Sequence, residues 1–178
     1  MALTTYNIDG AHSSIAFSVR HMVFAKVRGQ FTRWEGAVAF DDADPSRSSV
    51  EATIDAGSID THEAQRDGHL KAADFLDVEK FPKIAFKSKR FEAAGKDRYR
   101  IVGDLTIKSA TKEVTLDTEH LGGGKDPWGN QRIGVSAKTT IDRGDFGLKW
   151  NQALETGGLL VGEKVEIEID LELTKPKE

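Results

Sequence analysis

The segment VEIEIDLEL, residues 165–173, alternates without a break between apolar and acidic side chains. Successive side chains of a strand point to opposite faces, so this segment is predicted to be a strand with one dry face and one wet face. Nine residues at about 3.3 Å each span roughly 30 Å, longer than the usual strand of ~17–20 Å. The chain is therefore expected to form a tall sheet, and its dry face must be covered by other side chains or by an apolar ligand.

The same alternation recurs along most of the chain. It predicts about eight strands, within residues 15–21, 27–40, 50–56, 84–88, 99–107, 114–120, 133–141 and 165–173. Between Phe31 and Trp34 the apolar positions slip by one residue, which indicates a bulge or bend inside a strand. Turn-forming residues separate the strands, chiefly at 41–48, 92–97 and 122–130.

One segment, DTHEAQRDGHLKAADFL at 60–76, has a helical pattern. Asp60 is expected to cap the helix, with Glu63 three residues on as in a capping box, although Gly68 in the middle costs about 1 kcal/mol relative to Ala. Antiparallel strands with a single inserted helix protect their edges best by closing into a barrel. The predicted fold class is all-β: an extended antiparallel up-and-down β-barrel of about eight strands, whose interior is either filled by side chains or holds one small ligand.

Composition excludes several function classes. A chain of 178 residues with 38% hydrophobic content is expected to form a single domain, residues 1–178. The formal net charge is −4 and the basic residues are scattered, so nucleic-acid binding is not expected. The absence of Cys excludes disulfides, thiolate nucleophiles and Cys-based metal sites.

The N-terminus has neither the basic nor the apolar region of a secretory signal, and no stretch is apolar enough to span a bilayer. A cytoplasmic location is therefore expected, or a periplasmic one if a signal has been trimmed.

Motifs that resemble catalytic or metal sites fail on inspection. HEAQR at 62–66 begins like a zinc-protease motif but has Arg66 in place of the second histidine. His62 and His69 would lie roughly 10 Å apart along a helix, too far for one tetrahedral site. GGGKD at 122–126 lacks the required residues of a phosphate loop and fits a hairpin. No metal, cofactor or catalytic residue is predicted.

His21 ends an otherwise apolar strand face that begins at Ile15. One interpretation is a rim histidine satisfied by backbone or water. The other is a polar donor at the mouth of a cavity, where the head group of an amphiphile would need one. The pattern of the strand alone leaves both open.

Longer blocks of the chain resemble the YceI-like family of polyisoprenoid-binding proteins. The resemblance is collinear from about residue 6 to 173 and is carried by IDGAHSSIAFSVRHM, KVRGQF, SVEATIDAGSIDT, QRDGHLKAADFLDVEKFP, GDLTIKSATKEVTL, KDPWGNQR and RGDFGLKWNQALETGGLLVGEKVEIEIDLEL. It implies a lipocalin-like barrel around a polyisoprenoid or another long-chain amphiphilic lipid, and a homodimer. The chain departs from the family pattern in lacking the signal peptide of many relatives and in having Ser109, Ala110 and Thr111 at a turn that is usually Gly-Val-Thr.

Alternation and resemblance together predict the site. The expected lining of an apolar tunnel is Ile15, Phe17, Val19, Phe31, Trp34, Ile101, Leu105, Leu116, Val135, Ile141, Phe146 and Trp150. Small inward residues are expected to leave room in it: Gly36, Ala52, Ala56, Gly103, Ala137 and Thr139. His21 and Arg28 are expected to meet the head group, and residues 146–160 to form either a mobile lid or a packed plug.

The expected function is to bind and sequester or transport the lipid. Two alternatives stay open at this point: an enzyme acting on an isoprenoid-type ligand, with His21 or His120 as general base, and a stress-related protein whose lipid is structural.

Overall fold

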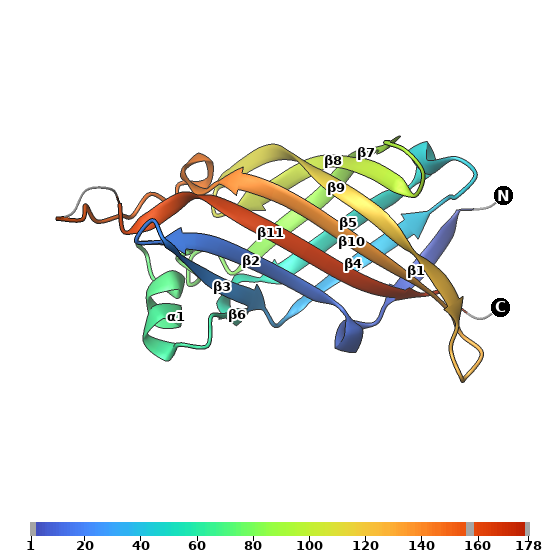
Figure 1. Cartoon of the computed structure of the whole chain (residues 1–178), viewed down its shortest axis with the longest axis horizontal. Coiled ribbons are helices and arrows are strands. Elements are labelled where there is room, and N and C mark those ends of the chain that lie inside the picture. The colour runs from blue at the N-terminus through green and yellow to red at the C-terminus, as the bar shows by residue number, and fades with distance from the viewer. Residues whose placement is uncertain (1–2, 156–158, 177–178) are drawn as a thin grey trace.

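Eleven strand segments form one antiparallel sheet in the computed structural model, which describes residues 3–155 and 159–176 (Figure 1). The strands are β1 (Thr4–Ile8), β2 (Ser14–His21), β3 (Ala25–Phe31), β4 (Trp34–Phe40), β5 (Ser49–Asp55), β6 (Ile59–Asp60), β7 (Lys83–Ala93), β8 (Arg98–Ile107), β9 (Ala110–Lys125), β10 (Gln131–Asp142) and β11 (Val161–Thr174). The helix is α1 (Ala64–Lys71), and the short 3-10 turns are η1 (Gly10–His12), η2 (Pro45–Arg47), η3 (Ala56–Ser58) and η4 (Arg143–Phe146).

The eleven segments make a closed ring of eight strands, because three of the eight are each interrupted once. β1 and β2 flank η1, β3 and β4 flank a bend, and β5 and β6 flank η3. Each composite strand pairs with its neighbour in sequence, and β11 returns to pair with both β1 and β2. This is the predicted up-and-down, lipocalin-like barrel, and the expectation of about eight strands is confirmed.

The predicted slip between Phe31 and Trp34 is the bend between β3 and β4. The backbone N–H groups of Thr32 and Arg33 leave the sheet there and donate to the carbonyl and the hydroxyl oxygen of Ser58, at 3.1 and 3.0 Å. Ser58 is buried, so its oxygens satisfy donors that would otherwise be orphaned where the strand breaks.

The predicted helix exists but is shorter, and its predicted cap is wrong. Glu63, not Asp60, is the N-cap, and its carboxylate accepts from the backbone N–H groups at 65 and 66. Asp60 belongs to β6. Between Asp60 and the helix lies His62, whose φ of 61° is a left-handed backbone conformation that does not occur inside a right-handed helix. The helix ends at Lys71 with Ala72 as its C-cap, and Phe75 and Leu76 beyond it are buried in the core.

β11 shows why the barrel is tall. It has 14 residues, which at about 3.3 Å per residue is roughly 46 Å of strand. Figure 1 shows it running from the end of the barrel that carries α1 to the end where both chain termini lie. Within residues 3–155 and 159–176, no helix is long and apolar enough to cross a membrane.

Candidate ligand-binding cavity

The dry face of β11 covers a cavity. Val165, Ile167, Ile169, Leu171 and Leu173 all line an internal space of about 670 Å³. A volume of this size lies within the ~300–1,000 Å³ typical of sites for small organic ligands. The interior is thus only partly filled by its own side chains, which is the condition for holding a ligand.

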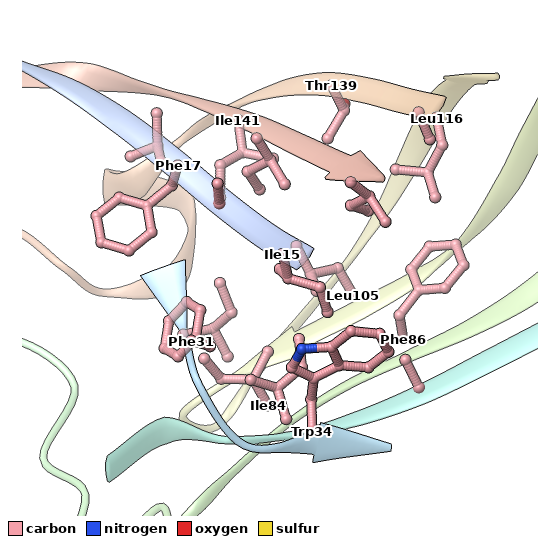
Figure 2. Close-up of a pocket in the computed structure, with 18 of the residues that line it drawn as sticks. Ile15, Phe17, Phe31, Trp34, Ile84, Phe86, Leu105, Leu116, Thr139 and Ile141 are labelled. Carbon is pink, nitrogen blue, oxygen red and sulfur yellow. The ribbon is translucent and has the colours of Figure 1, made fainter. Parts of the chain in front are cut away.

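Most of the predicted lining residues border this cavity. Figure 2 shows aromatic and branched aliphatic side chains converging on a common space from several strands. The predicted residues that line the cavity are Ile15, Phe17, Val19, Phe31, Trp34, Ile101, Leu105, Leu116, Val135, Ile141 and Trp150. Phe146 is the exception: it is 2% exposed but does not border the cavity, because η4 folds onto β9, β10 and β11 and the ring is used in that packing. That these side chains contact a ligand stays a prediction.

Strand register arranges part of the lining in successive levels along the barrel. Residues paired across β2, β11 and β10 form three of them: Val19, Val165 and Ile141; Phe17, Ile167 and Thr139; Ile15, Ile169 and Ala137. Small Ala137 and Thr139 sit beside large neighbours, and they line the cavity as do Gly36 and Ala52. Mixed sizes at one level leave free volume that a uniform row of Leu would fill.

Two glycines let aromatic rings lie flat against the barrel wall. A Cβ on Gly29 would stand 2.5 Å from Cζ of Phe17, and a Cβ on Gly103 would stand 2.6 Å from Cζ of Phe86. Both rings line the cavity. Gly103 therefore does not leave a void as predicted: its missing side chain is the space that the Phe86 ring occupies.

The two predicted head-group residues differ in position. His21 lines the cavity and is paired with Val161. Arg28 is exposed and does not line it, because side chains of β3 alternate and Val27 faces the cavity. Arg28 is therefore not part of the cavity wall, as the alternation of side chains along β3 could have indicated, and its contact with a head group stays a prediction.

The polar residues of the cavity that the sequence analysis missed include Arg66 and His69 of α1, and Arg143 of η4. Arg66 donates from Nε and Nη2 to the side-chain and carbonyl oxygens of Thr61, both at 2.7 Å. Together with His21 these residues bring cationic and donor groups to the α1 end of the cavity, where Glu63 also lines it, whereas the three levels of β2, β11 and β10 are apolar except for Thr139. A charged residue in a loop carries no sequence signal of burial, which is why Arg143 escaped notice.

Arg143 is 5% exposed and bonds only backbone carbonyls. Its Nε donates to Gly162 at 2.7 Å, Nη1 to Leu148 at 2.6 Å and Trp150 at 3.0 Å, and Nη2 to Val161 at 3.3 Å. No carboxylate of the described residues lies within 4 Å of it. Desolvation by burial lowers the pKa of Arg143 from its ordinary value.

An aromatic cluster joins α1 to the segment after η4. The ring of His69 packs edge-on against Trp150, with centroids 4.7 Å apart, and against Phe75 at 5.0 Å, while its Nε2 lies 2.9 Å from Oδ2 of Asp74. Asn151 exchanges two hydrogen bonds with the backbone of Val161, at 2.7 and 3.0 Å. The described parts of residues 146–160 are thus bonded and packed as a corner plug would be, while Gly157 and Gly158 of the predicted lid lie outside the described residues.

A metal centre is not assigned. Within the described ranges one trio, Asp9, His12 and Glu172, has ligand atoms within 4.8 Å of one another on the outer surface. Nη1 of Arg132 already lies 2.8 Å from Asp9 and 3.1 Å from Glu172, so a guanidinium neutralises the carboxylates that a cation would need. His62, also considered for metal, is exposed.

Comparisons with known proteins agree with this architecture. The model of the YceI-like domain matches residues 6–173. A UPF0312 protein of Staphylococcus aureus (strain MSSA476) is 41% identical over 173 residues, 97% of this chain and 98% of that protein. The crystal structure of Burkholderia cenocepacia BcnA superposes with a TM-score of 0.82 at 24% identity, over 93% of this chain and 99% of that one. A polyisoprenoid-binding domain from Saccharophagus degradans, implicated in plant cell wall breakdown, superposes with a TM-score of 0.68 at 14% identity, over 98% and 100% of the two chains.

Proposed function

The chain belongs to the YceI-like domain family, and we propose on that premise that it binds a long-chain polyisoprenoid or similar amphiphilic lipid inside the barrel and sequesters or transports it. The observation that carries the proposal is the dry face of β11, which borders an internal cavity along its length. The solved domain from Saccharophagus degradans, described as polyisoprenoid-binding, supports the choice of ligand class.

The energetics suit a flexible apolar chain. Each CH₂ removed from water contributes about 0.8 kcal/mol, and part of that gain is offset by ordering the chain and by its lost rigid-body freedom. Selectivity must then come from the length of the cavity and from a few polar groups. Arg66 and His21 at the α1 end favour a head group that accepts hydrogen bonds or carries negative charge.

At the two histidines considered as general bases, the structure favours binding over catalysis. His21 and His120 both line the cavity, but no hydrogen bond within the described residues joins either side chain to a carboxylate or a hydroxyl group. His120 instead stacks on Phe40, with centroids 6.5 Å apart. A general base normally needs such an orienting partner.

The test is native mass spectrometry of the freshly purified protein, followed by organic extraction and lipid analysis. We expect a discrete added mass that resolves into an isoprenoid or related lipid and that exchanges with added competitor. A lipid that never exchanges would favour the structural role, and a lipid chemically converted during incubation would favour the enzyme. A protein that stays at bare chain mass after incubation with isoprenoid lipids would refute the proposal.

The same proposal includes a homodimer and a cytoplasmic location. Both follow from the sequence expectations, and neither has a structural counterpart in a single chain. The native mass spectrum reports the dimer directly, at twice the chain mass. Cell fractionation followed by immunoblotting reports the location, and recovery of the protein in the periplasmic fraction would contradict it.

A further inference from the structure

The tip of the β2–β3 hairpin is apolar and exposed. Met22, Val23 and Phe24 have exposed fractions of 36%, 59% and 80%, and Leu159 beside them has 43%. The N–H of Met22 donates to the carbonyl of Leu160 at 2.8 Å, which fixes the tip against the segment that carries Leu159. Large apolar side chains in consecutive exposed positions are unfavourable in water, so this tip is suited to contact with a surface.

The backbone of the tip makes these residue types harder to explain by folding alone. Met22 and Val23 have φ of 53° and 71°, in the left-handed region. Hairpin turns with such angles favour Asn and Gly, and a β-branched residue there is an outlier. Backbone strain of this kind clusters at functional sites of proteins.

The position of the tip connects it to the cavity. His21, the residue before Met22, lines the cavity. Figure 1 shows the β2–β3 turn at the same end of the barrel as α1, which carries the lining residues Arg66 and His69. Anything that contacts the tip is therefore next to the polar end of the cavity.

The β2–β3 hairpin that carries the tip is basic in a chain that is acidic overall. Residues 14–31 contain Arg20, Lys26 and Arg28 and no Asp or Glu. Lys26 lies 3.5 Å from Glu166, whereas Arg20 and Arg28 have no carboxylate within 4 Å in the described part of the chain. An apolar tip flanked by unpaired cations is complementary to an anionic bilayer surface.

We propose that the β2–β3 tip inserts into the interface of a lipid bilayer that contains anionic lipids and holds the polar end of the cavity against it. This inference rests on the proposed lipid carrier and names the surface with which it exchanges its ligand. The opposite end differs in charge. Trp128 there is 74% exposed, but its N–H donates to Asp126, and the carboxylates of Asp126, Asp9 and Glu172 gather around Arg132.

The experiment is flotation with vesicles of phosphatidylcholine alone or mixed with phosphatidylglycerol. The test variants are Phe24→Ser and Val23→Gly/Phe24→Ser, and the matched control is Trp128→Ser at the other end. We expect wild-type protein and the control to float with the anionic vesicles and less with neutral vesicles or at high salt. Because the bilayer interface would bury the ring of Phe24, its loss in Phe24→Ser should weaken partitioning onto the vesicles about tenfold or more.

Wild-type protein that fails to float, or tip variants that float like wild type, would overturn docking at the tip. So would sedimentation showing that the tip variants lose self-association instead of vesicle binding, since the occupant would then be a second copy. Native mass spectrometry of the same samples separates the two proposals. Tip variants that still carry lipid show that only docking has changed, whereas vesicle binding by a protein that never takes up lipid would refute the carrier alone.

Discussion

Nη1 of Arg143 donates to the carbonyl of Leu148 at 2.6 Å while Nε of the same guanidinium donates to the carbonyl of Gly162 at 2.7 Å. One buried cation therefore ties η4 and the segment after it to the start of β11. A loop of backbone carbonyls around a buried guanidinium is a rigid arrangement. The carbonyls of Gly162, Leu148 and Trp150 would lose their only described side-chain donor if the arginine left, whereas that of Val161 also accepts from Asn151. Arg143 therefore helps to hold the α1 end of the cavity in shape, together with the packing of His69, Phe75 and Trp150.

Replacing Arg143 by Met should destabilise the fold by about 2–4 kcal/mol, because buried carbonyls lose donors that water cannot replace. Arg143→Lys should be intermediate, since an ammonium group reaches fewer of the carbonyls. The free energy of unfolding comes from urea denaturation. Hydrogen exchange should show faster exchange at the N–H groups of 148–152 and 160–162 in the Met variant. Equal protection in wild type and variant would contradict the anchoring role.

The Arg132 network predicts how stability responds to acid. Hydrogen bonds from His12 and then Arg132 lower the pKa of Asp9 to about 2. At Asp126, desolvation raises the pKa, but hydrogen bonds from Arg132 and Asn130 outweigh it and leave the pKa well below its usual range. A carboxyl whose folded pKa is below the unfolded value of about 3.9 stabilises the fold above that pH and loses the contribution as pH falls through the folded pKa.

Arg132→Met should therefore lower Tm near neutral pH and flatten the decline of Tm between about pH 4 and pH 2. Arg100→Met is the control, since this exposed arginine of β8 has no ion pair within the described residues. Thermal unfolding followed by circular dichroism at a series of pH values gives the comparison. A slope for Arg132→Met as steep as that of wild type would show that the network does not carry the acid dependence.

The strands could be predicted because their signal is local. The alternation at 165–173 and the slip between Phe31 and Trp34 each follow from the period of two and survive in the structure. The helix cap could not, because the choice between Asp60 and Glu63 depends on the backbone of His62, which turns left-handed. The alternation also does not reveal that η1 interrupts the barrel strand made of β1 and β2, or that η3 interrupts the one made of β5 and β6.

The apolar wall of the cavity was likewise predictable and its polar end was not. Strand parity places Ile15 and Phe17 on one inner face, and the same rule excludes Arg28. Arg66 and Arg143 reach the cavity from a helix and a 3-10 turn, where tertiary packing decides which side chain points inward. No period in the sequence carries that information.

Phe17→Asn should weaken lipid binding about tenfold to a hundredfold, because an amide that faces the apolar cavity must give up water without a partner, at a cost of ~1–3 kcal/mol. The ring it replaces lies 5.7 Å from that of Phe31 and lines the cavity. Ser18→Asn is the matched control, since Ser18 bonds Glu166 on the outer face at 3.3 Å. Displacement of a fluorescent lipid gives both affinities. Equal losses of lipid affinity in the two variants would mean that alternate side chains of β2 do not divide into ones that face the cavity and ones that face solvent.

Ala137→Phe should shorten the cavity. Ala137 lines it on β10, opposite Ile169 of β11, between the polar α1 end and the levels formed by Leu171 and Leu173. A ring there fills space that a long chain needs but a short one does not, at an overpacking cost of about 1–3 kcal/mol to the fold. Lys138→Phe adds the same ring on the exposed side of β10.

We expect Ala137→Phe to lose affinity for long isoprenoid alcohols by about tenfold or more while keeping that for short ones, and Lys138→Phe to change neither. Competition titrations with alcohols of increasing chain length measure this directly. Selective loss means that the ligand enters with its head group near His21 and runs along the barrel axis towards Leu173. An equal loss for all lengths would mean that the ligand lies across the α1 end, and the dry face of β11 beyond Ile169 would then serve folding alone.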